Sequence, residues 1–96
     1  MTVYAIAQLK IHNPERYSKY FAGFMATLEG IDCTPLANDE NPAVLEGEWH
    51  ADKVLLLAFK DAENFQKWAS SDAYQAIVQD RRASSDGTVL LVQGLS

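Results

Sequence analysis

The alternation of apolar and polar positions predicts three well-defined strands. Residues 2–11 alternate along the chain, with a wholly apolar odd face and a mixed even face. Residues 54–59 are apolar on both faces, which is typical of a strand that is covered on both sides. Thr88–Val92 has the same two-sided apolar pattern and predicts a last strand. The stretch from Lys53 to Arg82, which joins the central strand to the second helical region, is the most strongly patterned part of the chain.

Two helical regions lie between these strands. Asn13-Pro14 predicts the start of the first helix, because an Asn side chain can accept hydrogen bonds from free amides and Pro has no amide to leave unpaired. Apolar residues then recur three and four positions apart until Gly30, where we expect the helix to end. The second region begins at Asp61, restarts at a second cap at Ser71, and ends at Ser84–Gly87.

The segment between the helical regions is less regular. Ile31–Leu36 predicts a short, weak strand, and Asn38–Pro42 has the composition of a loop. Ala43–His50 alternates again, and Ala51-Asp52 can form a tight turn into the central strand. Residues 43–60 are therefore predicted to form a β-hairpin.

This order of elements predicts an α+β, ferredoxin-like fold over a single domain, residues 1–96, in which a split β-α-β unit forms an antiparallel sheet. Both helical regions must then cover the same face of the sheet. We expect Leu55, Leu57 and Phe59 to lie on the other, uncovered face, together with the second faces of the first and last strands. An apolar face of that size needs a cover, which predicts a homodimer formed through the sheet face.

Composition narrows the classes of function. The net charge is −5 and the eight basic residues are scattered, with only Arg81-Arg82 adjacent, so we do not expect nucleic-acid binding. The longest apolar run, Val54–Phe59, is far shorter than a membrane span, and the first residues lack the pattern of a secretory signal. A cytoplasmic protein is expected. Cys33 has no His or Cys at ligand spacing, and we predict neither a metal nor a cofactor.

Two residues in the predicted hairpin are candidates for catalysis. Glu46 and His50 fall on one face of the strand predicted at 43–50, where a carboxylate and an imidazole could share a proton-transfer site. Glu46 is followed by Gly47, which would let a ligand approach closely. The alternative is a solvated hairpin face without chemistry.

Four residues of the helical regions are candidates for ligand binding. Arg81 follows Tyr74 by nearly two helical turns, so both lie on one face, where the guanidinium could bind the carboxylate of a ligand or of Glu46. Tyr20, Trp68 and Tyr74 could line a pocket and supply hydrogen-bond donors. Alternatively, Arg81 extends to solvent and the aromatic residues only fill the core. Arg82 is expected on the surface.

Several short motifs occur in an order that resembles a known family. They are Asn13-Pro14-Glu15 with Tyr17 and Tyr20, Glu46-Gly47 with Trp49, Phe59, Trp68, Ser71 with Tyr74-Gln75 and Arg81, and Val92-Gln93-Gly94. Together they resemble the domain of unknown function 1330 family, small proteins of the dimeric α/β-barrel superfamily. The resemblance implies the fold and the dimer but no activity. The chain departs from the family pattern at Gly30-Ile31, where two glycines are usual, and at Ala58, where Glu is usual.

Three hypotheses about function follow. In the first, the protein is a cofactor-independent enzyme acting on a small organic acid or an aromatic compound, with Glu46 or His50 as the base and Arg81 as the anion anchor. This rests on the superfamily, which includes monooxygenases and isomerases. In the second, the same pocket binds a small molecule without catalysis. In the third, the protein is a structural or interaction dimer without a pocket.

Overall fold

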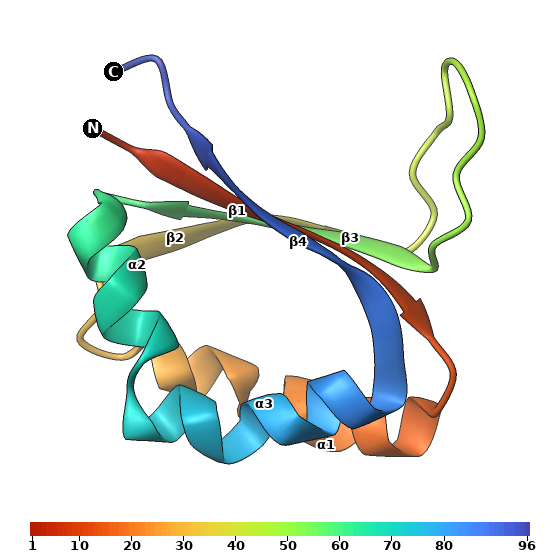
Figure 1. Ribbon diagram of the computed structural model, residues 1–96, viewed down its shortest axis with the longest axis horizontal. Coiled ribbons are helices and arrows are strands. Elements are labelled where there is room, and N and C mark those ends of the chain that lie inside the picture. Colours follow the sequence, from red (N-terminus) through yellow and green to blue (C-terminus); the bar gives the residue numbers. More distant parts are fainter.

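The computed structural model describes residues 1–96 and contains a four-stranded antiparallel sheet with all helices on one face (Figure 1). The strands are β1 (Val3–Ile11), β2 (Cys33–Asp39), β3 (Lys53–Phe59) and β4 (Ser85–Gln93), in the spatial order β2-β3-β1-β4. The helices are α1 (Pro14–Phe24), the 3₁₀ turn η1 (Met25–Leu28), α2 (Ala62–Ala69) and α3 (Asp72–Ser84). The predicted α+β, ferredoxin-like fold is confirmed.

The predicted helix starts are present with their hydrogen bonds. The side chain of Asn13 accepts a hydrogen bond from the amide of Arg16 at 3.2 Å, and Pro14 is the first residue of α1. Asp61 accepts from the amide of Asn64 at 2.8 Å, and Ser71 accepts from the amide of Tyr74 at 3.2 Å. These caps satisfy amides that the first turn of each helix leaves free, so each helix begins where the sequence predicts.

The central strand β3 faces the helices with the opposite set of side chains from the one expected. Leu55, Leu57 and Phe59 are buried beneath the helices, and Phe59 has an exposed fraction of 0%. The expectation that these three residues lie on the uncovered face is therefore wrong. Because β3 is apolar on both faces, its own pattern could not distinguish them. The register with β1 decides, since it pairs Phe59 with Val3 and Leu57 with Ala5 on the core face.

The face of the sheet away from the helices has no cover within the chain (Figure 1). Its central row runs Leu90, Ile6, Leu56 and Ala37 across the four strands. The neighbouring positions on this face include Tyr4, Val54, Ala58 and Val92. Edge strand β4 is exposed on both faces, because the helices lie over β1 and β3. The apolar face that the sequence predicts therefore exists, with Val54, Leu56 and Ala58 as its β3 members.

The predicted hairpin at residues 43–60 is wrong. Residues 40–52 contain no strand and form an exposed loop, which we call the β2–β3 loop; it extends from the end of the sheet on the side away from the helices (Figure 1). The reason is that β2 is longer than the predicted Ile31–Leu36 strand and pairs with β3 from Cys33–Phe59 to Asp39–Val54, with a bulge after Pro35. The other edge of β3 is taken by β1, so no free edge remains for residues 43–50.

Two glycines of the C-terminal strand region lie against the backbone of β1. A Cβ atom added at Gly87 would collide with the carbonyl oxygen of Gln8, and one at Gly94 would lie 2.7 Å from the carbonyl oxygen of Thr2. These positions accept only a residue without a side chain. They therefore hold β4 in one register along β1, in which Ala7 pairs with Val89 and Ile6 with Leu90.

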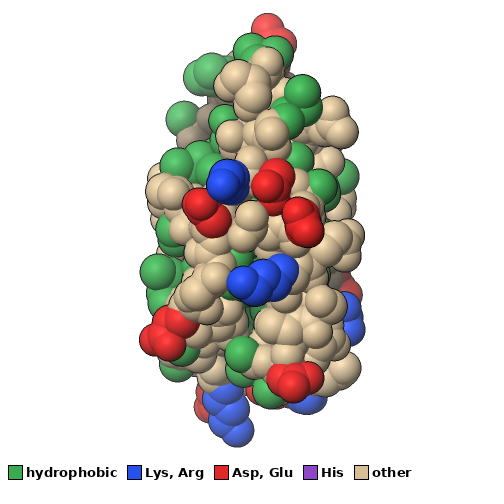
Figure 2. All heavy atoms as spheres, turned by 90° about the vertical axis from the view of Figure 1, so that its left-hand side faces the viewer, with side chains coloured by type: hydrophobic (Ala, Val, Ile, Leu, Met, Phe, Trp, Pro, Cys, Tyr) green, Lys and Arg blue, Asp and Glu red, His purple; other side chains and the backbone are tan.

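Acidic and basic side chains are interspersed on the end of the molecule that carries α2, without an extended patch of one sign (Figure 2). No helix is both long and apolar enough to cross a bilayer.

A buried hydrogen-bond chain connects α2 to the turn after α1. The indole nitrogen of Trp68 donates to the hydroxyl of Thr27 at 2.9 Å, and that hydroxyl donates to the carbonyl of Phe24 at 2.6 Å. Both side chains are buried, so neither has water as an alternative partner. This chain fixes the indole ring in the core.

Replacing Thr27 by Val keeps the shape of the side chain but leaves the Trp68 N–H without a partner. We expect the free energy of unfolding to fall by about 1–3 kcal/mol, the cost of a buried unsatisfied donor. Urea unfolding monitored by tryptophan fluorescence measures this. Ser18→Ala also removes a hydroxyl, but at an exposed position of α1; it is the control and should change the free energy by less than about 0.5 kcal/mol. Equal effects of the two substitutions would contradict the role of the hydrogen bond.

Candidate functional site

A cavity of about 280 Å³ lies between the sheet and the helices. It is apolar over most of its surface and opens between α3 and β4, where its exposed lining residues Gln75, Arg82 and Val89 lie. The side chains that line it come from β1, β3, β4, α1, α2 and α3, and they are Ala5, Ala7, Leu9, Tyr17, Tyr20, Phe24, Leu55, Leu57, Phe65, Trp68, Ala69, Tyr74, Gln75, Arg81, Arg82 and Val89. The space exists because β1 contributes small side chains, Ala5 and Ala7, beneath the large rings of the helices.

The helix side of the cavity is a continuous set of packed aromatic rings. The centroids of Trp68 and Tyr74 are 4.0 Å apart, and Phe24 meets Trp68 edge-on at 6.0 Å. Tyr20 lies 5.8 Å from Phe24, and Phe65 lies 6.1 Å from Trp68. Ring pairs at these separations attract each other beyond the area they bury. The wall is therefore held in shape before any ligand binds.

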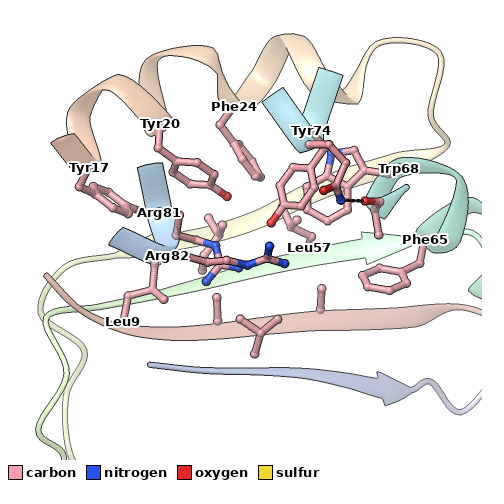
Figure 3. Close-up of a pocket in the computed structure, with 16 residues that line it drawn as sticks. Leu9, Tyr17, Tyr20, Phe24, Leu57, Phe65, Trp68, Tyr74, Arg81 and Arg82 are labelled. Atoms are coloured by element: carbon pink, nitrogen blue, oxygen red, sulfur yellow. Dashed lines mark hydrogen bonds between the residues drawn. The ribbon is translucent and has the colours of Figure 1, made fainter. Parts of the chain in front are cut away.

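Two arginines of the last turn of α3 extend into the cavity. Arg81 and Arg82 both reach beneath the aromatic rings (Figure 3). Neither guanidinium forms an ion pair or a side-chain hydrogen bond within the chain, whereas Arg16 pairs with Asp80 at 2.8 Å. No acidic residue lines the cavity. The cavity thus combines apolar walls with two unpaired cations.

Three tyrosines supply hydroxyl groups around the same space. The hydroxyl of Tyr17, on a side chain that is only 6% exposed, is buried and has no hydrogen-bond partner. Burial raises its pKa to about 12, although Arg81 acts in the opposite direction. Burial also raises the pKa of Tyr20, and the hydroxyl of Tyr74 adds to this effect. At neutral pH the Tyr17 and Tyr20 hydroxyls are therefore protonated and can donate hydrogen bonds.

The structure brings together all four residues that the sequence predicts for ligand binding. Tyr20, Trp68, Tyr74 and Arg81 line one cavity, and their role in binding stays a prediction. Arg82, expected on the surface, also lines the cavity. The helical repeat places only Arg81 on the apolar stripe, but Arg82 reaches the same space because its side chain is long. Tyr17 could have been found from its place on the apolar stripe of α1.

The two predicted catalytic residues do not lie in this cavity. Glu46 and His50 are exposed in the β2–β3 loop and line shallow hollows elsewhere on the surface. His50 lies 3.3 Å from Glu48, with both side chains in solvent. The expectation that Glu46 and His50 share a strand face is wrong, since the segment is not a strand. Their catalytic role stays a prediction, and within one chain they do not converge on Arg81.

A second hollow beside the cavity contains a buried lysine. Lys53 is 2% exposed, and its ammonium lies 3.8 Å from the ring centroid of Phe21 and 4.9 Å from that of Tyr17. It forms no ion pair. Burial lowers its pKa, and the negative charge of Glu40 opposes that shift. The aromatic rings stabilise the charged form by cation–π attraction and replace part of the hydration that the amine loses.

No three His, Cys, Asp or Glu side chains are grouped so that they could hold a metal ion. Cys33 is half-buried, and burial raises the pKa of its thiol to about 11, which disfavours the reactive thiolate at neutral pH.

Comparison with protein families assigns the chain. The family described as "Domain of unknown function (DUF1330)" matches residues 2–95. The chain belongs to this family. The resemblance to the DUF1330 family, which the short motifs indicate, is confirmed over residues 2–95. A comparison with curated proteins finds no significant match.

Solved structures share the fold at low sequence identity. A protein of unknown function from Rhodopseudomonas palustris superimposes with a TM-score of 0.84 at 15% identity, over 99% of this chain and 83% of that one. A dimeric ferredoxin-like protein of unknown function from Jannaschia sp. CCS1 superimposes with a TM-score of 0.76 at 15% identity, over 98% of this chain and 100% of that one. SnoaB, a cofactor-independent oxygenase from Streptomyces nogalater, superimposes with a TM-score of 0.69 at 16% identity, over 99% of this chain and 94% of that one. These similarities show the fold.

The buried amine of Lys53 should be visible in the pH dependence of stability. Its pKa is lower in the folded protein, so the unfolded chain binds more protons as the pH approaches 10.5, and stability rises with pH in that window. Lys53→Met removes this contribution. We expect the stability of the variant relative to wild type to decline steadily between pH 8 and 10, measured by urea unfolding.

The matched control is Lys60→Met, at an exposed position. Its stability relative to wild type should stay constant over the same pH range. If the stability of Lys53→Met relative to wild type is also constant over this range, the pKa of the Lys53 amine is the same in the folded and unfolded states. That result would contradict the prediction.

Proposed function

We propose that the DUF1330 chain binds a small organic acid with an aromatic or branched apolar body in the cavity between sheet and helices. The observation that carries this proposal is the pair of unpaired guanidiniums, Arg81 and Arg82, in an apolar cavity that no acidic residue lines. A carboxylate is the partner that a planar guanidinium binds best, through two parallel hydrogen bonds.

The walls select the rest of the ligand. The aromatic rings and the Ala5–Ala7 floor favour an apolar body and exclude water, which strengthens the attraction between the carboxylate and the guanidiniums. A volume of about 280 Å³ is close to the lower limit of roughly 300 Å³ for drug-sized ligands, so a molecule with one ring is favoured. The unpartnered hydroxyl of Tyr17 is available for one further polar group.

Binding is better supported than catalysis by a single chain. General-base catalysis needs a group that accepts a proton within hydrogen-bond reach of the substrate, and no carboxylate or imidazole lines the cavity. SnoaB is a cofactor-independent oxygenase, but at 16% identity it shares only the fold with this chain. A cofactor-independent enzyme acting on the same class of acids is the second candidate, and it requires a base from outside the cavity.

Calorimetric titration with benzoate and phenylacetate tests the proposal. We expect both anions to bind and their neutral amides to bind at least tenfold more weakly. Arg81→Gln should weaken benzoate binding by about 10- to 100-fold, the equivalent of the roughly 1.5–3 kcal/mol of a charged hydrogen bond. Lys60→Gln removes the same charge far from the cavity and should leave the affinity unchanged. Benzoate affinity that survives Arg81→Gln combined with Arg82→Gln would refute the anion site.

We also propose that the chain forms a homodimer through the uncovered face of its sheet. The row Leu90–Ile6–Leu56 is apolar and lacks a cover, and two antiparallel sheets can pack face to face at about 10 Å. Similar proteins from Jannaschia sp. CCS1 and Thermobifida fusca are described as dimeric. A two-fold arrangement would bury the row of each copy against that of the other.

Leu56→Arg tests the dimer by placing a charge in the middle of this row. We expect light scattering to show a dimer for the wild-type protein at micromolar concentration and a monomer for the variant. Met25→Arg, at an exposed apolar position on the helix side, is the control and should remain dimeric. A wild-type monomer, or a dimer unaffected by Leu56→Arg, would overturn this proposal.

A further inference from the structure

We infer that the β2–β3 loop, residues 40–52, of one subunit closes the mouth of the partner subunit's cavity, so that each ligand site is completed by the second copy. The inference rests on the proposed dimer and on the proposed acid-binding cavity. Three independent features of the chain support it: an incompletely covered mouth, an unpaired loop with matching chemistry, and the length of that loop.

The mouth of the cavity remains open even when the sheet face is covered. Strand β4 directs Val89 and Leu91 to the helix side of the sheet and Leu90 and Val92 to the other side. Each of these four residues has an exposed fraction between 40% and 50%. A second sheet packed face to face covers only Leu90 and Val92. Val89, which lines the cavity, still lies beside solvent, so another segment is needed to shield the apolar edge.

The β2–β3 loop carries apolar side chains that nothing in its own chain covers. Leu45 is 91% exposed and Val44 is 50% exposed, although both are large and apolar. The loop extends on the side of the sheet opposite to its own cavity (Figure 1). It therefore cannot cover that cavity, but it does lie on the side where the partner sits in the proposed dimer.

The charges of the loop and of the cavity mouth are complementary. Glu46 follows Leu45 directly and Glu48 comes two residues later, and both carboxylates are exposed. Glu46 forms no ion pair, and Glu48 lies 3.3 Å from His50. Arg81 and Arg82 are the unpaired cations of the cavity. A loop that places an apolar tip over an apolar mouth brings its acidic residues toward the two arginines. The same contact would be unfavourable with a cavity mouth lined by acidic residues, because like charges repel.

The loop is long enough to reach the partner's cavity. It contains thirteen residues between the end of β2 and the start of β3. Six residues in each direction at about 3.3 Å per residue give a reach of roughly 20 Å. Packed sheets are about 10 Å apart, so the tip can pass the partner's sheet edge and reach its helix side. A loop half as long could not do so.

This arrangement gives a role to Glu46 and His50, which do not line the cavity of their own chain. The partner subunit's Glu46 and the partner subunit's His50 would lie at the mouth of the cavity, where a proton acceptor is otherwise missing. The carboxylate–arginine contact would also compete with a ligand acid, so binding of the ligand and seating of the loop would be coupled through Arg82, the exposed member of the pair.

Disulfide formation between two differently labelled copies tests the inference. In a Cys33→Ser background, which removes the chain's single thiol, one sample carries Leu45→Cys and the other Gln75→Cys, an exposed position at the cavity mouth. The samples are mixed, allowed to exchange subunits and oxidised. The control pair combines Leu45→Cys with Lys19→Cys, an exposed position on α1 outside the cavity lining. Mass spectrometry identifies each mixed disulfide.

We expect at least tenfold more mixed disulfide with Gln75→Cys than with Lys19→Cys, because a disulfide requires Cα atoms within about 7 Å. Val44→Cys in place of Leu45→Cys should give the same preference. A light-scattering dimer without this preference overturns the loop inference and leaves the dimer standing. A monomer overturns both. Benzoate titration of the reduced samples reports separately whether the cavity binds acids.

Discussion

Strand β3 is apolar on both faces, but the chain supplies a covering layer for only one of them. The helices pack over β1 and β3, and the four-stranded sheet is wider than the layer they form. Two features follow from this mismatch. Below the sheet, the helix layer ends before β4 and leaves a cavity that opens at the edge. Above the sheet, the row of Leu90, Ile6 and Leu56 has no cover. The proposed ligand site and the proposed dimer are thus two results of one incomplete layer.

The electrostatics of the cavity depend on where α3 ends. Arg81 and Arg82 belong to its last turn, where the free carbonyl groups carry a partial negative charge that stabilises nearby cations. This end effect allows two guanidiniums to remain beneath a wall of aromatic rings without a carboxylate in the same chain. It does not satisfy their planar hydrogen-bonding edges, which stay available to an acid from solution or from another subunit. The tyrosine hydroxyls add neutral hydrogen-bond donors, so every polar group of this kind in the cavity can donate a hydrogen bond to an anion.

Much of this arrangement could be predicted from the sequence, and the errors have identifiable causes. Local signals were sufficient for the helix starts at Asn13, Asp61 and Ser71, because a cap and its free amides lie within a few residues. The order of elements was enough for the fold, and the helical repeat was enough to place Tyr74 and Arg81 on one face of α3. The face of β3 was mistaken because Leu55 and Leu56 are chemically identical, and only pairing with β1 distinguishes them. The prediction of a strand at residues 43–50 is wrong because the alternation of apolar and polar residues does not show whether a neighbouring strand has a free edge. Both edges of β3 are already paired, with β1 and β2. Arg82 was not predicted, because helical periodicity gives the direction of a side chain but not how far a long side chain extends.

The glycines at the two ends of β4 have a consequence for how this protein can vary. Gly87 and Gly94 fix one alignment of β4 along β1, and that alignment sends Val89 to the cavity and Leu90 to the uncovered face. Moving the strand by a single residue would exchange these two destinations. Insertion of one residue between the glycines would therefore change the ligand site and the subunit contact at the same time. The spacing of Gly87 and Gly94 constrains both surfaces together, so neither can be redesigned through strand length without the other.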